Sequence, residues 1–427
     1  MPSPAPESGR RAPARVLILG GGFGGLYAAT YLGAADLPSD AAEVTLVSAT
    51  NHFTFNPLLA EVVAGSLGQA HVTFPLRVIA ERYGFRFVLG RVERIDPAPR
   101  RVRTSAGDLL YDYLIVALGA TARFFGNEEI ERNSLPLTSV PDALAIRNRV
   151  LAMAERAAQA TDPRARRRCL TFAVAGAGPA GVEVASEIWH LLRHVLPRYY
   201  GNADRARVVI LEGGERILRG WDGQLAAAGL ERLRDRGIEV HLRTRVLGYD
   251  GRLVRASNAR GAMSLEADTL IWTAGTAPAT GPLADSGLSL AATGHLETDE
   301  ALRVRGRERI FAVGDCASLV NPRTGRPYPP VAPIAISQGV RAAANVENAI
   351  MGRQLEPYQA HHAGKIVSLG SGVALADLLG FRLTGRIAWS LYRITYLLKL
   401  VGLQNKVRAA TTLALNRIFG RNLSCVD

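Results

Sequence analysis

The stretch VLILGGGFGGLYAATYL, residues 16–32, decides the fold. It predicts a short buried strand, a tight glycine turn and the start of a helix. The stretch AVAGAGPAGVEVASE, residues 173–187, predicts the same three elements a second time. A turn of this kind presents backbone N–H groups and a helix N-terminus to a pyrophosphate. The chain therefore carries two candidate dinucleotide sites.

Further apolar strands complete a dinucleotide fold around each turn. AEVTLVS (42–48) and YDYLIVALGA (111–120) follow the first turn, and RVVILEGG (207–214) and DTLIWTAGT (268–276) follow the second. ERIFAVGDCASL (308–319) is expected to return the chain to the first domain. The pattern predicts an α/β protein with two Rossmann-like domains, one inserted in the other.

The domain boundaries follow from the positions of these strands. We expect the first domain at residues 15–137 and 291–356, and the inserted second domain at residues 138–290. Residues 1–14 contain no apolar segment, so they predict a disordered leader rather than a signal peptide. Residues 357–427 differ in character and are expected to form a separate C-terminal region of amphipathic helix for membrane association.

The composition is that of a folded protein with a basic surface. The 427 residues are 48% hydrophobic and 21% charged, with a formal net charge of +13. Such a charge suits nucleic acid, acidic ligands or an anionic membrane. The chain has no cluster of basic and aromatic residues on a recognition element, so nucleic acid is not expected. No apolar run reaches about 18 residues without a charge, so no transmembrane helix is expected.

The three cysteines, Cys169, Cys316 and Cys425, are far apart in the sequence. Their spacing argues against a disulfide framework, a thiolate metal site and a CxxC redox pair. No metal site is expected.

In the first turn, Gly20, Gly22 and Gly25 meet the GxGxxG requirement for a tight turn, close approach of a ligand and close packing of the helix. Phe23 lies within this turn, and the helix is expected to continue over residues 26–32. Ser48 stands at the end of the next strand, where a ribose-binding carboxylate is usual. Its hydroxyl is expected to bind a ribose hydroxyl without charge assistance.

In the second turn, Gly176, Gly178 and Gly181 repeat the pattern, with Pro179 inside the turn and a helix expected from Val182. The following strand ends in Glu212. A carboxylate there accepts hydrogen bonds from the ribose hydroxyls and repels a 2′-phosphate, which predicts NADH rather than NADPH. Two turns suggest a tightly held flavin and an exchangeable nicotinamide coenzyme.

From residue 15 onward the chain resembles the two-dinucleotide-binding-domain flavoproteins, and among them type II NADH dehydrogenase, the single-subunit NADH:quinone oxidoreductase. The stretches that carry the resemblance are VLILGGGFGGLYAA, NHFTFNPLLAEVVAGSL, YDYLIVALGA, AGAGPAGVEVASEI, LEGGERIL, IWTAGT, IFAVGDCA and the basic C-terminal tail. The resemblance implies FAD in the first domain, NADH in the second, and transfer of two electrons through the flavin to a membrane quinone without proton pumping.

The resemblance also assigns roles to particular residues. Gly314 and Asp315 would bind the flavin ribityl chain, and the small turns at residues 117–120 and 274–276 would lie along FAD and NADH. The candidate cofactor-binding residues are thus Gly20, Gly22, Phe23, Gly25, Ser48, Ala117, Gly119, Gly314, Asp315 and Ala332 for FAD, and Gly178, Pro179, Gly181, Glu212, Ala274 and Gly275 for NADH.

Two candidate catalytic residues come from the resemblance as well. Glu183 matches a family glutamate near the contact of nicotinamide and flavin; the alternative is an exposed acid that favours the helix dipole. Many members carry AQxxxQ at the start of a helix linked to the quinone site. Aligned from Ala332, this sequence has Pro333 and Ser337 at the two glutamine positions. Gln338 follows directly and is the second candidate catalytic residue.

The tail, residues 380–427, combines eight basic residues with Trp389, Tyr392 and many aliphatic side chains. Arg393 and Lys399 interrupt the apolar run, so the tail predicts an amphipathic helix in the membrane interface. The alternative is a helix packed on the flavin domain or in a homodimer contact. With a lipid-soluble quinone as acceptor, we expect a peripheral protein on the cytoplasmic face of the cell membrane.

Other functions remain open at this point. Sulfide:quinone oxidoreductase shares the expected fold but needs paired redox cysteines beside the flavin, whereas Cys169 and Cys316 are more typical of small buried residues. A disulfide reductase is excluded by the lack of CxxC. A flavin-bound NADH sensor without enzymatic turnover is the alternative from another class.

Overall fold

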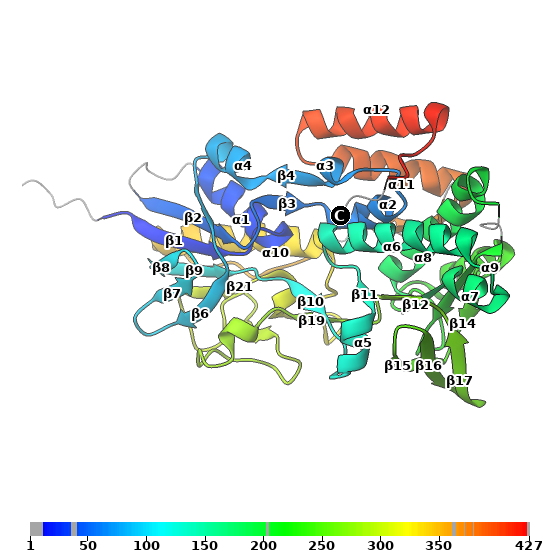
Figure 1. The fold of residues 1–427 in the computed structure, drawn as a ribbon. Helices are drawn as coiled ribbons and strands as arrows, with labels where there is room; N and C mark the ends of the chain where they lie inside the picture. Colours follow the sequence, from blue (N-terminus) through cyan, green and yellow to red (C-terminus); the bar gives the residue numbers. More distant parts are fainter. Residues whose placement is uncertain are drawn as a thin grey trace, which may run out of the picture. The chain divides into compact units, whose positions relative to one another are not determined.

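The computed structural model describes residues 12–35, 41–201, 205–360, 364–370, 372–378 and 380–424. The chain divides into two compact units (Figure 1). Unit 1 comprises residues 1–53, 75–121 and 277–361, and unit 2 comprises residues 54–74, 122–276 and 362–427. Most of the expected leader, together with Cys425, lies outside the described residues.

Unit 1 is built on a parallel sheet of five strands in the order β21–β9–β1–β2–β5. These strands are β1 (Ala14–Leu19), β2 (Ala42–Ser48), β5 (Arg86–Leu89), β9 (Tyr113–Val116) and β21 (Ile310–Ala312). The central strand β1 is buried from Val16 to Leu19, as expected for a parallel sheet covered on both faces. An antiparallel sheet adds β6 (Val92–Asp96), β7 (Arg101–Thr104) and β8 (Gly107–Leu110).

The helices α1 (Phe23–Ala34) and α10 (Ala332–Ile350) pack against each other in unit 1. A Cβ added to Gly339 of α10 would overlap the carbonyl oxygen of Gly24 in α1. The close approach of the two backbones therefore requires glycine at position 339. The remaining elements of unit 1 are α4 (Leu76–Tyr83) and the short strands β20 (Leu296–Glu297), β22 (Ala317–Ser318), β23 (Val320–Asn321) and β24 (Arg326–Pro327).

Unit 2 repeats this plan with the parallel order β11–β18–β12–β13–β14. Its strands are β11 (Leu135–Pro136), β12 (Thr171–Ala175), β13 (Arg207–Leu211), β14 (Glu239–His241) and β18 (Thr269–Trp272), with an antiparallel sheet of β15 (Arg245–Tyr249), β16 (Leu253–Asn258) and β17 (Gly261–Glu266). In each unit the strand before the glycine turn lies at the centre, next to the strand that follows the turn's helix. The predicted α/β class with two Rossmann-like sheets is confirmed.

Unit 2 also contains α-helices. They are α2 (Leu59–Val63), α3 (Gln69–Val72), α5 (Glu128–Asn133), α6 (Val140–Gln159), α7 (Pro163–Cys169), α8 (Pro179–His190), α9 (Gly223–Asp235), α11 (Gly385–Lys399) and α12 (Leu403–Phe419). Of these helices, α6, α7, α8 and α9 pack against the parallel sheet. A π-helical turn, Leu191–Val195, extends α8, and β25 (Lys365–Ser368), β26 (Ala374–Leu378) and β27 (Phe381–Thr384) form a small antiparallel sheet. Four short strands lie where the chain passes between the units: β3 (His52–Thr54), β4 (Thr73–Pro75), β10 (Ala120–Ala122) and β19 (Thr276–Pro278).

The units divide after Thr121 and Thr276 rather than after residues 137 and 290. The hydrophobic cores explain the difference. Ile130 of α5 is buried in the core of unit 2, whereas Leu283 and Leu288 are buried in the core of unit 1. Core packing therefore sets the boundaries at positions that strand patterns do not mark.

The C-terminal residues do not form a separate region, because residues 362–427 belong to unit 2. In Figure 1, α12 lies beside α11 and α3. The Asn405 side chain donates to the Thr73 carbonyl at 3.0 Å, and His71 Nε2 lies 2.9 Å from Thr412 Oγ1. Among the described residues, no helix has the length and hydropathy needed to cross a membrane.

Candidate functional site

The glycine turn of unit 1 leaves one face open to a ligand. Gly20 has φ +108°, and a Cβ there would overlap the carbonyl oxygen of Ala117 at the end of β9. A Cβ on Gly25 would overlap the carbonyl oxygen of Gly20. By contrast, a Cβ on Gly22, the N-cap of α1, would have no atom within 4 Å. The outer glycines are thus needed for packing, and the central glycine borders open space, as a pyrophosphate cradle requires.

The glycine turn of unit 2 has the same geometry. Gly176 has φ +98°, and a Cβ there would lie 2.7 Å from the Thr273 carbonyl oxygen at the end of β18. A Cβ on Gly181 would overlap the Gly176 carbonyl oxygen, whereas one on Gly178 would meet nothing within 4 Å. Pro179 follows directly in the first turn of α8. Each unit therefore holds its own cradle at the carboxyl edge of its own sheet.

Other predicted residues of unit 1 gather at the same sheet edge. The backbone N–H of Val313, after β21, donates to the Val116 carbonyl at 3.0 Å, which places the Gly314–Asp315 turn beside the end of β9. Burial raises the pKa of Asp315, and the nearby His295 opposes this shift. Gly119 has φ +73°, and a Cβ added to it would meet no other atom within 4 Å.

Ser48 and Phe23 are held by neighbouring groups. Ser48 is buried at the end of β2, where its hydroxyl accepts a hydrogen bond from the Thr50 backbone at 3.3 Å. A Cβ on Gly21 would lie 2.7 Å from that hydroxyl, so Ser48 sits directly beneath the turn. The ring of Phe23 meets Phe53 edge to face, with centroids 5.0 Å apart.

Gln338 and Ser337 point to different partners. Gln338 is buried, and its Oε1 accepts a hydrogen bond from the Gly314 backbone at 2.8 Å, so it fixes the turn expected to bind the ribityl chain. The Ser337 hydroxyl lies 2.9 Å from the Pro333 carbonyl and 2.8 Å from the Tyr358 hydroxyl. Sequence patterns gave no signal for Tyr358, because it comes from the segment after α10.

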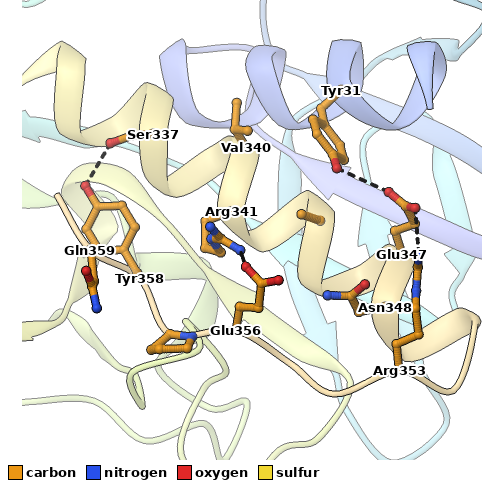
Figure 2. Close-up of a pocket in the computed structure, with 12 residues that line it drawn as sticks. Tyr31, Ser337, Val340, Arg341, Glu347, Asn348, Arg353, Glu356, Tyr358 and Gln359 are labelled. Atoms are coloured by element: carbon orange, nitrogen blue, oxygen red, sulfur yellow. Dashed lines mark hydrogen bonds and ion pairs between the residues drawn. The ribbon is translucent and has the colours of Figure 1, made fainter. Parts of the chain in front are cut away.

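Figure 2 shows that Ser337 and Tyr358 lie at one end of a cavity of about 940 Å³ in unit 1. The rest of its wall combines polar residues with Val340, Ala344 and Pro357, and its charged side chains pair with one another. Arg341 pairs with Glu356, Arg353 pairs with Glu347 at 2.7 Å, and the Tyr31 hydroxyl donates to Glu347 at 3.3 Å. This cavity offers no unpaired charge for a ligand among the side chains drawn.

Glu212 is fixed against the glycine turn of unit 2. Its Oε2 accepts a hydrogen bond from the Ala177 backbone at 2.6 Å, and its Oε1 accepts one from the Gly214 backbone at 2.6 Å. These bonds orient the carboxylate beside the cradle and leave lone pairs for ribose hydroxyls. Ala274 and Gly275 follow β18 on the other side of the same turn.

Glu183 is buried inside unit 2, so the alternative of an exposed acid at the start of α8 is wrong. Its Oε1 accepts a hydrogen bond from the Ser368 backbone at 3.0 Å. Burial raises the pKa of Glu183 to about 8, and the charges of Glu61 and Glu187 act in the same direction. Glu183 therefore holds a proton at neutral pH.

The two neighbouring carboxylates pair with guanidinium groups of the C-terminal segment. Glu61 accepts a hydrogen bond from Arg393 of α11 at 2.7 Å, and Glu187 lies 3.9 Å from Arg421. Burial raises the pKa of Glu187, and Arg421 opposes that shift. These buried pairs attach the C-terminal helices to unit 2, and removal of one partner would leave an unpaired buried charge.

The described cysteines give no support to thiol chemistry. Cys169 and Cys316 are both buried, and burial raises the pKa of each thiol to about 11. Both therefore stay protonated at neutral pH, which makes them poor nucleophiles. The described residues also contain no group of His, Cys, Asp and Glu that could hold a metal ion.

Comparisons with known proteins agree with this geometry. Residues 14–339 match the family described as pyridine nucleotide-disulphide oxidoreductase. The type II NADH:quinone oxidoreductase Ndh of Mycobacterium tuberculosis is 31% identical over 429 residues, which cover 95% of this chain and 89% of that protein.

Two solved structures share the fold at lower identity. NDH2 from Plasmodium falciparum in complex with NADH aligns with a TM-score of 0.88 at 20% identity, over 96% of this chain and 99% of that one. The sulfide:quinone oxidoreductase of Aquifex aeolicus aligns with a TM-score of 0.73 at 18% identity, over 96% of both chains.

The buried proton of Glu183 predicts a pH-dependent stability. Since its pKa rises from 4.5 to about 8 on folding, its contribution to stability is complete below pH 4.5 and is lost as the pH rises to about 8. Glu183→Gln removes this loss while keeping an oxygen for Ser368. We expect its melting temperature to exceed that of the wild type by ~3 °C or more at pH 8.5, with a smaller difference at pH 5.

Scanning calorimetry across this pH range measures the effect, and the exposed Glu231 of α9 supplies the control. Glu231→Gln should follow the wild-type pH profile. Parallel profiles for wild type and Glu183→Gln would show that Glu183 is ionised in the folded protein.

Proposed function

Because this chain belongs to the type II NADH:quinone oxidoreductases, we propose that it transfers two electrons from NADH through bound FAD to a membrane quinone, without proton pumping. The membership confirms the resemblance inferred from the sequence motifs between residue 15 and the basic tail. The observation that carries the proposal is the pair of cradles, in which a Cβ at Gly22 or at Gly178 would meet only open space. One cradle serves FAD and the other serves NADH.

The residues of unit 1 fit FAD. Gly20, Gly22 and Gly25 shape the pyrophosphate cradle, and Ser48 lies beneath it for the ribose. Asp315 would accept a hydrogen bond from a ribityl hydroxyl, on a turn that Gln338 holds through Gly314 N. We assign Phe23, Ala117 and Gly119 to the same site.

The start of α10 supplies charge stabilisation. Bound FAD would supply the hydride acceptor for NADH and the electron donor for the quinone. A Cβ on Gly314 would lie 3.3 Å from the Ala335 Cβ, so the first turns of α10 border the ribityl-binding turn. The N-terminus of this helix, at Ala332, carries a partial positive charge that would stabilise negative charge on a reduced flavin. No side chain needs to act as a nucleophile.

The two cradles can be tested separately, because the central glycines have extended backbone conformations that valine tolerates. The wild type should be purified yellow, release FAD on denaturation, and oxidise NADH with a short-chain quinone. Gly22→Val should lose FAD. Gly178→Val should stay yellow but lose reduction by NADH, because its side chain fills only the second cradle.

Each variant is the control for the other, with flavin absorbance and anaerobic reduction as the two measurements. Release of FMN, or absence of flavin from the wild type, would contradict the FAD site. Rapid flavin reduction by NADH without reoxidation by quinone would favour the NADH sensor instead.

Glu212 should decide between the two nicotinamide coenzymes. In Glu212→Gln the repulsion of a 2′-phosphate disappears, so the ratio of kcat/KM for NADPH to that for NADH should rise about tenfold, which corresponds to about 1.4 kcal/mol. Steady-state kinetics with both coenzymes measure the ratio. Asp222→Asn, at the N-cap of α9, is a control acid of unit 2. A wild type that uses both coenzymes equally well would contradict the assignment.

We also propose that α11 and α12 bind the membrane as a peripheral attachment on the cytoplasmic face. The exposed apolar side chains on these helices are Ile387, Ile394, Leu398, Leu403, Val407, Leu415, Ile418 and Phe419. Basic residues flank them, including Arg386, Lys399, Arg408 and Arg417. This combination suits an anionic lipid surface, and a homodimer contact on the same face is the alternative.

A charge on the exposed face tests this proposal better than a truncation, because deletion of the helices would remove Arg393 and Arg421 from the buried carboxylates. The double variant Ile394→Glu/Ile418→Glu should lose most sedimentation with anionic liposomes at low salt and keep NADH-dependent reduction of a short-chain quinone. Val320→Glu, an equally exposed site of unit 1, should bind like the wild type.

Two results would count against membrane binding. One is a wild type that ignores anionic liposomes at low salt. The other is a double variant whose main effect is conversion of a dimer to a monomer in light scattering, which would assign the apolar face to a second copy of the chain.

A further inference from the structure

Phe125 is an aromatic residue that unit 2 holds in an unfavourable backbone conformation. Its φ is +55°, in the left-handed region that bulky side chains avoid. Its side chain is nevertheless 61% exposed, so burial of the ring does not explain the conformation. Phe125 and Gly126, which both have positive φ, are the central residues of a tight turn that the Asn127 backbone N–H closes by donating to the Phe124 carbonyl at 3.0 Å, so the turn holds the ring at the surface.

The loop before Phe125 is fixed by contacts within unit 2. The Arg123 backbone N–H donates to the Gly275 carbonyl at 3.1 Å, and Trp272 Nε1 donates to the Arg123 carbonyl at 2.9 Å. Phe124 stacks on Trp272 with ring centroids 5.9 Å apart. The ring of Phe125 is therefore presented from an ordered loop.

This ring lies beside the turn that follows β18. A Cβ added to Gly275 would lie 3.3 Å from Cζ of Phe125. The guanidinium of Arg123 lies 4.8 Å from the centroid of the Phe125 ring. No carboxylate of the described residues lies within salt-bridge distance of Arg123, so its positive charge is not neutralised by a neighbour.

The strand order assigns this turn to one end of the coenzyme. The neighbouring strands β18, β12 and β13 are followed by the turn with Gly275, by the glycine turn and by Glu212, respectively. A dinucleotide whose adenosine ribose binds Glu212 and whose pyrophosphate lies on Gly178 must direct its nicotinamide half toward Gly275. Phe125 and Arg123 stand at that end.

We propose that Phe125 forms the wall of the nicotinamide end of this site, held by Arg123, and that the pair favours NADH over NAD⁺. The inference rests on the proposed binding of NADH to unit 2. The nicotinamide ring gains from contact with an aromatic ring in either oxidation state, so the discrimination comes from Arg123. The oxidised ring carries a positive charge, which the Arg123 guanidinium repels. The pair thus holds the substrate and promotes release of the product.

Anaerobic stopped-flow measurements on the purified holoenzyme test both residues. Phe125→Ala should raise the Kd of NADH roughly threefold to tenfold, with little change in the limiting rate of flavin reduction. Phe125→Tyr, which keeps the ring, should restore the Kd to within about twofold. Arg123→Gln should lower the inhibition constant of NAD⁺ roughly threefold to tenfold, because the repulsion disappears.

Tyr199, another exposed aromatic residue of unit 2, supplies the matched control, and Tyr199→Ala should leave both constants unchanged. An unchanged Kd in Phe125→Ala, or a failure of Phe125→Tyr to restore it, would overturn the role of the ring. An unchanged NAD⁺ constant in Arg123→Gln would overturn the discrimination between the two coenzymes. Failure of NADH to reduce the wild type would instead reject the proposed function.

Discussion

In each unit, the packing of the central strand against the helix that follows it depends on one glycine carbonyl oxygen. This oxygen leaves no room for a side chain on the glycine that faces it. In unit 1 the Gly20 carbonyl lies against Gly25, and in unit 2 the Gly176 carbonyl lies against Gly181. A Cβ at the third glycine would push the helix away from the strand. The helix N-terminus would then no longer face the space next to the central glycine. The close packing of strand and helix and the binding surface are therefore consequences of the same contact.

Features encoded by neighbouring residues could be predicted from the sequence. The glycine turns lie where their spacing places them, and Glu212 stands at the end of the strand after the second turn. Its two hydrogen bonds, to Ala177 N and Gly214 N, join groups at adjacent strand ends. Because strand, turn and helix follow one another directly, the pattern determines both the fold class and the position of this carboxylate.

Features that depend on distant segments could not be predicted. Glu183 is buried because elements far along the chain cover it, and its hydrogen-bond partner Ser368 is 185 residues away. The spacing of apolar residues along α8 does not predict that distant elements bury Glu183. Likewise, Ile130 and Leu283 join cores on opposite sides of the expected boundaries. The hydroxyl groups of Tyr358 and Ser337 form a hydrogen bond, although the segment that contains Tyr358 carries no motif.

The pairing of Glu61 with Arg393 has a consequence for biosynthesis. The two residues are 332 positions apart, and at about 5–20 residues per second a ribosome needs roughly 15–65 s to add that length. Throughout this interval the nascent chain contains the carboxylate but not its cation. Burial of Glu61 without its partner is strongly unfavourable, so this part of the core must stay hydrated until the C-terminal helices emerge. The second unit therefore completes this part of its core only after Arg393 has been synthesised.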